Sequence, residues 1–271
     1  MERRALCALL LAATPAQAAC PDLRTMALFA QAILEGRAPE PFRNLSIDDA
    51  RCAQDRLVAF LAQPWGDAVG YRIALAPGGA GPMRGTIFHA TLRATSPARL
   101  QARSSAAPVM EAALLLRIGR DGIAAAGEEP VAILRHIDQV IPFIMVSDAV
   151  AQPYPADLIA RNLGTRAGVV GTPIAVEASA EFARGLGALT VLLLGDQREL
   201  SRANGGALQG HPLGAISWLV RDLAREGRVL RAGEYVALGG FSPPAPVEAG
   251  TRYTLRIEGL PGAMPVTVTL E

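Results

Sequence analysis

The feature that most constrains the fold is a series of short apolar segments from residue 68 onward, separated by stretches rich in glycine and proline. Segments of this length, bounded by such residues, predict β-strands. Few of them alternate with helical patterns in the way that a doubly wound parallel sheet requires. The sequence therefore favours a mixed, largely antiparallel α+β fold.

The expected elements follow from the spacing of the apolar residues. Helical spacing predicts helices over 23–34, 47–61, 131–137, 156–163 and 213–225, of which the first two would pack on the core. Strands are predicted over 68–75, 112–118, 140–146, 168–176, 190–194, 235–238, 253–257 and 265–270. Between the first two strands, the Gly/Pro segment 76–82 predicts a loop, either a mobile lid over a site or a plain surface connection.

Residues 1–18 have the three-part pattern of a secretory signal peptide. A basic start is followed by the apolar run 5–13, which is too short to span a bilayer, and by the small-x-small end at 16–18. We therefore expect a periplasmic or secreted protein with a single domain over residues 19–271. The alternatives are a buried N-terminal helix and, as a minor one, a lipid anchor at Cys20.

Composition excludes several classes of function. The formal net charge is only +1, so electrostatic binding to nucleic acid or to an anionic membrane is not indicated. Every basic residue apart from histidine is an arginine, which excludes Schiff-base chemistry through a lysine. Of the three cysteines, Cys7 falls in the expected signal peptide. Cys20 and Cys52 are either a disulfide or two buried thiols, and no cysteine spacing suggests a zinc site.

One stretch is specific enough to indicate a family. Residues 210–219, Gly-His-Pro-Leu-Gly-Ala-Ile-Ser-Trp-Leu, are similar to a motif of the 2-keto-4-pentenoate hydratases and oxalocrotonate decarboxylases. Further blocks follow in the order of that family, at 37–49, 69–73, 108–111, 142–148, 204–205 and 232–247. The chain thus resembles this branch of the fumarylacetoacetate hydrolase superfamily, whose fold is a rolled, mostly β structure with flanking helices.

The same motifs also have purely structural interpretations. Pro212 suits the first position of a helix, so His211 is better explained as a residue that starts the helix than as a catalyst. Tyr71 and Trp218 are typical core residues, and the prolines at 243, 244 and 246 form a rigid segment.

The resemblance implies a divalent ion, usually magnesium or manganese, held by a Glu-x-Glu pair on one strand and a glutamate on another. The matching positions here are Glu111, Ala113 and Met145. Alanine and methionine cannot supply the oxygen ligands that these hard cations require. With Glu111 as the only remaining ligand, we expect an absent or severely weakened metal site and no cofactor, although weak binding of magnesium or manganese stays open.

Other positions of the resemblance carry arginine. Arg72 stands where the family has a lysine after Gly-Tyr, and Arg161 and Arg166 lie at either end of a segment that replaces Asp-Asn-x-Ser-Ser-Gly. If the three converge, they could bind an organic dianion without a metal; otherwise Arg161 and Arg166 are surface charges. The candidate substrate-binding residues are Arg72, Asn162, Thr165 and Arg166.

Two main functions follow as expectations. The first is lyase-type chemistry on a small 2-oxo acid or dicarboxylate, in which Arg72 orients the substrate and Glu111 or Asp148 moves a proton. The second is a non-catalytic periplasmic binder of a small organic anion, that is, a pseudoenzyme. A partner subunit of an active relative is a third, and a homo-oligomer is expected from the resemblance alone.

Overall fold

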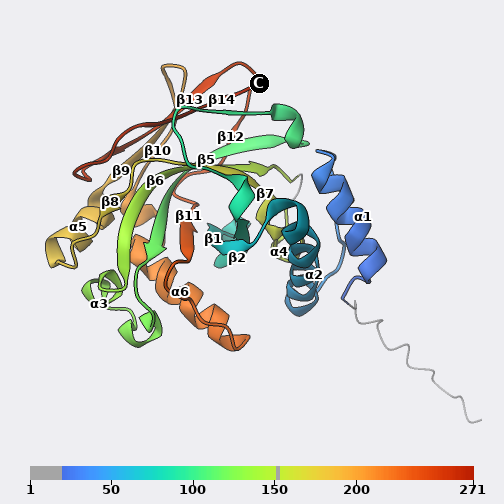
Figure 1. The fold of residues 1–271 in the computed structure, drawn as a ribbon, viewed down its shortest axis with the longest axis horizontal. Coiled ribbons are helices and arrows are strands. Elements are labelled where there is room, and N and C mark those ends of the chain that lie inside the picture. The colour runs from blue at the N-terminus through green and yellow to red at the C-terminus, as the bar shows by residue number, and fades with distance from the viewer. Residues whose placement is uncertain (1–19, 151–152) are drawn as a thin grey trace, which may run out of the picture.

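The computed structural model describes residues 20–150 and 153–271. Two β-sheets lie at the centre of the molecule, and helices pack around them (Figure 1). The predicted signal peptide, residues 1–18, lies outside the described residues. Of the helices described, none combines the length and the apolar character needed to cross a membrane.

The larger sheet has nine strands and carries the site. Its strands are β1 (Ala68–Leu75), β2 (Pro82–Phe88), β3 (Leu92–Arg93), β5 (Pro108–Ile118), β6 (Ile137–Asp148), β7 (Thr165–Val170), β8 (Ile174–Ala175), β11 (Tyr235–Leu238) and β12 (Ala245–Pro246). They follow the order β2-β1-β11-β5-β6-β7-β3, with β12 beside β5 and β8 beside β6. The pairs β1–β11 and β3–β7 are parallel, and the other pairs in this sheet are antiparallel.

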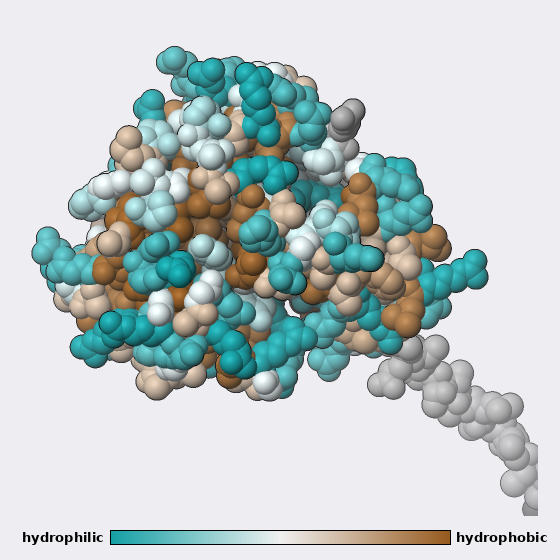
Figure 2. Space-filling model, viewed as in Figure 1, coloured by the Kyte–Doolittle hydropathy of each residue, from teal (hydrophilic) through white to brown (hydrophobic). Residues whose placement is uncertain are grey.

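The smaller sheet packs against the larger one. Its five strands are β4 (Ala98–Leu100), β9 (Thr190–Gly195), β10 (Arg198–Asn204), β13 (Arg252–Glu258) and β14 (Val266–Leu270), in the order β10-β9-β13-β14-β4. Along β13, Tyr253, Leu255 and Ile257 are buried and alternate with more exposed residues. Such alternation is what one buried face of a sheet produces. In Figure 2 apolar residues gather over the sheets on the face shown, with hydrophilic residues around them.

Six α-helices are described: α1 (Leu23–Leu34), α2 (Ile47–Trp65), α3 (Pro130–Leu134), α4 (Pro155–Ala160), α5 (Ala180–Ala188) and α6 (Pro212–Arg225). Helices α1, α2 and α4 lie together on one side of the large sheet (Figure 1), where α2 and α4 contact β2. The side chains of Asp22 and Ser46 accept hydrogen bonds from backbone N–H groups in the first turns of α1 and α2. These caps explain where the two helices begin.

The two faces of β5 and β6 contribute to different cores. Ala112, Leu114 and Leu116 belong to the main core, which also contains side chains of the smaller sheet and of α6. Ala113 and Leu115, with Met145 from β6 and others, form a separate cluster on the opposite face. Because both faces are buried, the sequences of the two strands are largely continuous apolar runs and do not alternate between apolar and polar residues.

The predicted α+β class is confirmed, and most predicted elements correspond to described ones with small changes of boundary. The strand predicted over 168–176 is divided into β7 and β8, and the helix predicted over 131–137 ends at Leu134, before β6 begins at Ile137. Several elements were not predicted: β2, β3, β4, β10, β12 and α5. In β2 the positive charge of Arg84 interrupts the apolar pattern, but this residue is buried because Asp222 and Glu226 pair with it. Sequence periodicity cannot recognise a charged residue that becomes buried through partners far along the chain.

Cys20 and Cys52 form a disulfide, with their Cα atoms 5.8 Å apart. The sequence left open whether these two residues are bonded or are separate thiols. The bond ties the segment just before α1 to the first turns of α2. It therefore holds the first described residues of the chain against the helical layer.

Candidate functional site

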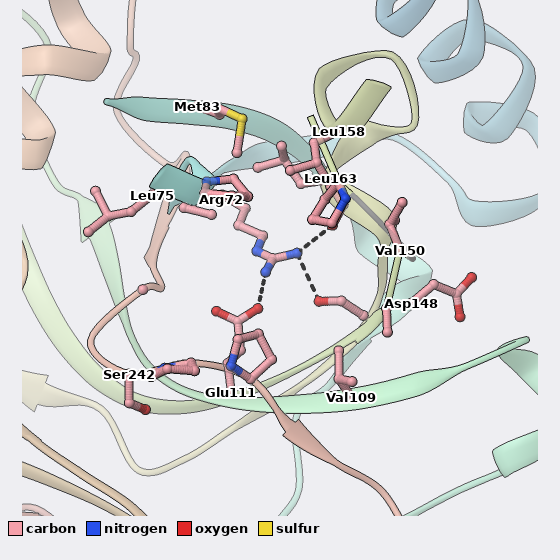
Figure 3. Close-up of a pocket in the computed structure, with 18 of the residues that line it drawn as sticks. Arg72, Leu75, Met83, Val109, Glu111, Asp148, Val150, Leu158, Leu163 and Ser242 are labelled. Carbon is pink, nitrogen blue, oxygen red and sulfur yellow. Dashed lines mark hydrogen bonds and ion pairs between the residues drawn. The ribbon is translucent and has the colours of Figure 1, made fainter. Parts of the chain in front are cut away.

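A cavity of about 570 Å³ lies beside the face of the large sheet that carries Ala113 and Leu115. Its volume lies within the range of about 300–1,000 Å³ that is usual for small-molecule sites. Strands β1, β2, β5 and β6, helix α4 and the segment between β11 and β12 contribute to its walls (Figure 3). The lining residues are Arg72, Ala74, Leu75, Pro77, Met83, Val109, Glu111, Ser147, Asp148, Ala149, Val150, Pro153, Leu158, Leu163, Gly240, Phe241, Ser242, Pro243 and Pro244.

Arg72 reaches into this cavity from β1 and is held from several sides. Its Nη1 donates hydrogen bonds to Ser147 Oγ at 2.8 Å and to the carbonyl oxygen of Leu163 at 2.9 Å, with Thr165 Oγ1 farther away at 3.4 Å. Its Nη2 pairs with Glu111 (Figure 3). The Nε atom is buried and has no hydrogen-bond partner among the described residues.

Gly70, two residues before Arg72, explains how closely β1 approaches β11. A Cβ atom at Gly70 would lie 1.9 Å from the carbonyl oxygen of Tyr235 on β11, so only glycine allows this close approach of the two strands. The register of β1 against β2 also shifts between Ala68 and Gly70. The Gly-Tyr-Arg sequence thus has a structural reason for its glycine. Tyr71 packs against the main core, and burial raises the pKa of its hydroxyl.

The three positions that correspond to metal ligands do lie together. Met145 is directly opposite Glu111 in the antiparallel ladder of β5 and β6. Ala113 follows Glu111 by two residues, which places the two side chains on the same face of β5. All three residues are buried. The three residues therefore lie next to one another on one face of the sheet.

The residues at this location do not fit a divalent cation. Glu111 is already paired with Arg72, and the adjacent positions carry a methyl group and a thioether. In the described part of the chain, no group of three or more histidine, cysteine, aspartate or glutamate side chains could hold a metal ion. Magnesium and calcium prefer several oxygen ligands at once, and a single, already paired carboxylate does not supply them.

Asp148 lines the cavity, but its carboxylate is held by other groups. Both Nε and Nη2 of Arg166 donate to Asp148 Oδ2, the first at 2.7 Å. Ser105 Oγ and the backbone N–H of Ala106 donate to its other oxygen. In Figure 3 the Asp148 side chain points away from the guanidinium of Arg72. The structure therefore places this candidate catalytic residue at the edge of the cavity, in an ion pair.

Asn162, Leu163 and Gly164 form a tight turn behind Arg72. All three have positive φ angles, of 54°, 55° and 64°. The side chain of Asn162 accepts a hydrogen bond from the N–H of Thr86 at 2.6 Å and donates one to its carbonyl oxygen at 2.9 Å. It thus satisfies the outer backbone groups of the edge strand β2, and the turn presents the Leu163 carbonyl to Arg72.

The three arginines do not converge on one cavity. Arg72 lines the large cavity, whereas Arg161 and Arg166 line a much smaller one together with Asn162 and Thr165. Arg161 pairs with Asp157 one helical turn before it and lies over the ring of Phe29. Arg166 also donates to the carbonyl oxygen of Ile33 in α1. Of the four predicted substrate-binding residues, Arg72 alone lines the large cavity.

The contacts by which Ser147 and the carbonyl of Leu163 hold Arg72 were not predicted. The segment 240–244, which includes two prolines of the predicted rigid segment, forms part of the wall. The resemblance pointed to the neighbourhood of Ser147 but gave no sign that its hydroxyl faces Arg72. From the loop 76–82, Pro77 reaches the cavity, which places this loop beside the site.

His211 begins α6. Its Nδ1 accepts a hydrogen bond from the N–H of Leu213, and its Nε2 lies 2.9 Å from the carbonyl oxygen of Ala183 in α5. His211 does not line the large cavity. The Gly-His-Pro-Leu motif, which indicated the family, thus marks a helix start rather than a group within the site.

No family model matches the chain. Among curated proteins, the 2-keto-4-pentenoate hydratase of Paraburkholderia phymatum is 44% identical over 75 residues, which are 28% of this chain and 29% of the relative. The 2-keto-4-pentenoate hydratase 1 of Dechloromonas aromatica is 29% identical over 157 residues, which are 56% of this chain and 57% of the relative. The similarity to these two relatives thus spans between 29% and 57% of their length.

Among solved structures, the 4-oxalocrotonate decarboxylase from Pseudomonas putida G7 with calcium and acetate superimposes with a TM-score of 0.77 at 21% identity, over 92% of this chain and 96% of that one. The same protein with magnesium and adipate gives a TM-score of 0.78 at 20% identity, over 92% and 97% of the two chains. At this identity the likeness shows the fold alone. The chain is thus similar in part of its sequence to 2-keto-4-pentenoate hydratases, and its fold is that of the 4-oxalocrotonate decarboxylase.

Proposed function

We propose that this chain binds a small organic carboxylate of the 2-oxo acid class beside Arg72 and that it does so without a divalent cation. The observation that carries the proposal is the Arg72–Glu111 ion pair, in which each side chain is 4% exposed. The pair puts a cation in the wall of the cavity and occupies the one carboxylate left at the three metal-matching positions. A guanidinium shielded from water is well suited to bind a carboxylate.

Arg72 acts in this proposal as a binding group and not as a base. An arginine side chain stays protonated in proteins, so it cannot remove a proton from a ligand, whereas a lysine at the same place could. The contacts with Ser147, Leu163 and Glu111 fix the plane of the guanidinium. A carboxylate beside it would therefore be bound in a defined orientation.

The names of the relatives favour this class of ligand. The hydratases are named for 2-keto-4-pentenoate, a five-carbon 2-oxo acid. The decarboxylase that shares the fold was solved with acetate and with adipate, both carboxylates. These compounds belong to those proteins. For this chain they indicate a five-carbon 2-oxo acid as the first ligand to test.

Lyase-type chemistry is a second candidate function, and one observation favours it. The hydrogen bond from Arg72 goes to oxygen Oε1 of Glu111, and among the hydrogen bonds of the described residues none goes to Oε2. Glu111 lines the cavity. Its second oxygen is therefore available to take up or return a proton at a carbon atom of a ligand held by Arg72.

Binding and metal content test the first proposal. Metal analysis of the purified, disulfide-bonded protein should find no stoichiometric divalent ion. Isothermal titration with 2-oxopentanoate should give the same dissociation constant with and without EDTA, and Arg72→Gln should abolish this binding. The exposed Arg202, changed to glutamine in the same way, is a matched control that should bind normally. A tightly held ion, or binding that EDTA removes, would contradict the proposal.

Turnover separates an enzyme from a binder. If the chain is a lyase, 2-hydroxypenta-2,4-dienoate should be consumed in the presence of EDTA, and Glu111→Gln should stop the reaction. Binding of the 2-oxo acid without any turnover would instead support the non-catalytic binder. Turnover that requires added magnesium would contradict metal independence.

Export and assembly remain proposals of our own. The Cys20–Cys52 disulfide supports export, because such bonds persist mainly in oxidising compartments. N-terminal sequencing of the protein from a periplasmic fraction should begin directly after Ala18 or Ala19, and an intact N-terminus in the cytosol would contradict this.

The expected homo-oligomer, or association with an active relative as a partner subunit, can be tested by light scattering after size-exclusion chromatography.

A further inference from the structure

The described residues that line the cavity offer a ligand a single cation. Among its lining residues Arg72 is the one basic side chain, and Glu111 and Asp148 are acidic. Arg166, which pairs with Asp148, does not line the cavity, and neither does Arg161. A second carboxylate on a ligand would therefore find no positive partner along these walls, and burying an unpaired charge is costly.

Arg72 itself has room for one carboxylate. A guanidinium carries five N–H donors. The two on Nη1 go to Ser147 and Leu163, and one on Nη2 goes to Glu111. One Nη2 donor therefore remains for a ligand carboxylate, and a hydrogen bond between two charged groups is about twice as strong as one between neutral groups.

The rest of the cavity is apolar and larger than a small 2-oxo acid requires. Leu75, Met83, Val109, Leu158 and Phe241 are among the residues that line it (Figure 3). Its volume of about 570 Å³ lies well within the range of about 300–1,000 Å³ that is usual for sites of drug-sized ligands. A five-carbon 2-oxo acid has only about eight non-hydrogen atoms, far fewer than a drug-sized ligand, so it would leave much of the cavity unfilled.

We propose that the ligand of this cavity is a monocarboxylate with an apolar tail longer than that of a five-carbon acid, and not a dicarboxylate. The proposal rests on the proposed function, because it assumes that a 2-oxo acid binds beside Arg72. Arg72 binds the carboxylate end, and the apolar walls receive the tail. Each buried methylene group contributes about 0.8 kcal/mol to binding, so additional length favours affinity until the cavity is filled.

Three compounds test the proposal on the full, disulfide-bonded protein by isothermal titration: 2-oxopentanoate, 2-oxooctanoate and 2-oxooctanedioate. We expect 2-oxooctanoate to bind at least about tenfold more tightly than 2-oxopentanoate, because it buries three more methylene groups. It should also bind at least about tenfold more tightly than 2-oxooctanedioate, whose distant carboxylate has no partner.

The outcomes distinguish this inference from the function on which it rests. If none of the three compounds binds, the proposed function itself fails. If 2-oxopentanoate binds but 2-oxooctanoate binds no better, or if 2-oxooctanedioate binds as tightly as 2-oxooctanoate, only the inference about the tail is overturned.

A nearly isosteric substitution locates the tail. Met83 is buried and lines the cavity, so Met83→Gln should weaken binding of 2-oxooctanoate several-fold while circular dichroism confirms the fold. Met264, which is 57% exposed and does not line the cavity, provides the matched control, and Met264→Gln should leave the affinity unchanged. Unchanged affinity in Met83→Gln would place the tail outside this cavity and would overturn the proposal.

Discussion

Arg72 on β1 and Glu111 on β5 form a buried ion pair, although a whole strand, β11, separates their strands in the sheet. The two residues are 39 positions apart in the sequence. Among the described lining residues, it is the one ion pair in which both side chains line the large cavity. We therefore expect stability, and in the proposed function also ligand binding, to depend on this pair.

Breaking the Arg72–Glu111 pair on one side should be strongly destabilising. Arg72→Met or Glu111→Gln alone should lower the free energy of unfolding by about 3–5 kcal/mol, because the remaining charge is left buried without a partner. The double variant should lose much less than the sum of the two. Urea denaturation measures these values, and simple additivity would contradict a coupled pair.

The exposed pair Arg202–Glu199 is a matched control for this cycle. Its Nη2–Oε2 distance is 3.0 Å, and each side chain is 48% exposed. The corresponding substitutions there should change the free energy of unfolding by no more than about 1 kcal/mol, since solvent screens the charges.

Restoring carboxylates should create a cation site. In the variant Ala113→Glu/Met145→Glu, the two new carboxylates would lie beside Glu111 on one face of the β5–β6 ladder. We expect saturable binding of Mn²⁺ in a calorimetric titration of this variant, with little or none in the wild type. Adding Glu111→Gln to it should weaken the binding. If the double variant folds and binds no ion, the correspondence of these positions to the family ligands is wrong.

Asn162 should stabilise the turn behind the site. Asn162→Ala removes both side-chain hydrogen bonds to Thr86, and we expect a loss of about 2–3 kcal/mol in the free energy of unfolding. Asn44 has a similar φ of 60° but is exposed and makes no side-chain hydrogen bond among the described contacts. Asn44→Ala should therefore cost no more than about 1 kcal/mol. Equal losses at both positions would mean that backbone conformation, and not the bonds to Thr86, dominates.

The disulfide should contribute substantially to stability. Cys20 and Cys52 are separated by 32 positions, and closing a loop of this length predicts a contribution of about 3–4 kcal/mol. Cys52→Ser should lower the midpoint of urea unfolding, and Cys20→Ser should have the same effect. A reducing agent should lower the midpoint of the wild type but leave that of the double variant unchanged. A wild type unaffected by reduction would contradict this role.

Much of the fold could be predicted from the sequence. The apolar spacing located α1, α2, β1 and most later strands, since burial of one or both faces leaves a periodic trace in the chain. It failed at β2, where the buried Arg84 forms an ion pair with Asp222, 138 positions away. It also failed at short or polar segments such as β4 and β10, whose pairing depends on neighbours in space.

The sequence by itself determined which residue types stand at the family positions: an arginine for a lysine, and Ala113 and Met145 where carboxylates would bind a metal. Only the tertiary structure decided what each charged group does. It pairs Arg166 with Asp148 and Arg161 with Asp157, and it leaves Arg72 in the wall of the cavity beside Glu111. The physical reason is that a side chain's partner is chosen by distance and burial in the folded chain, and residue type fixes only which partners are chemically acceptable.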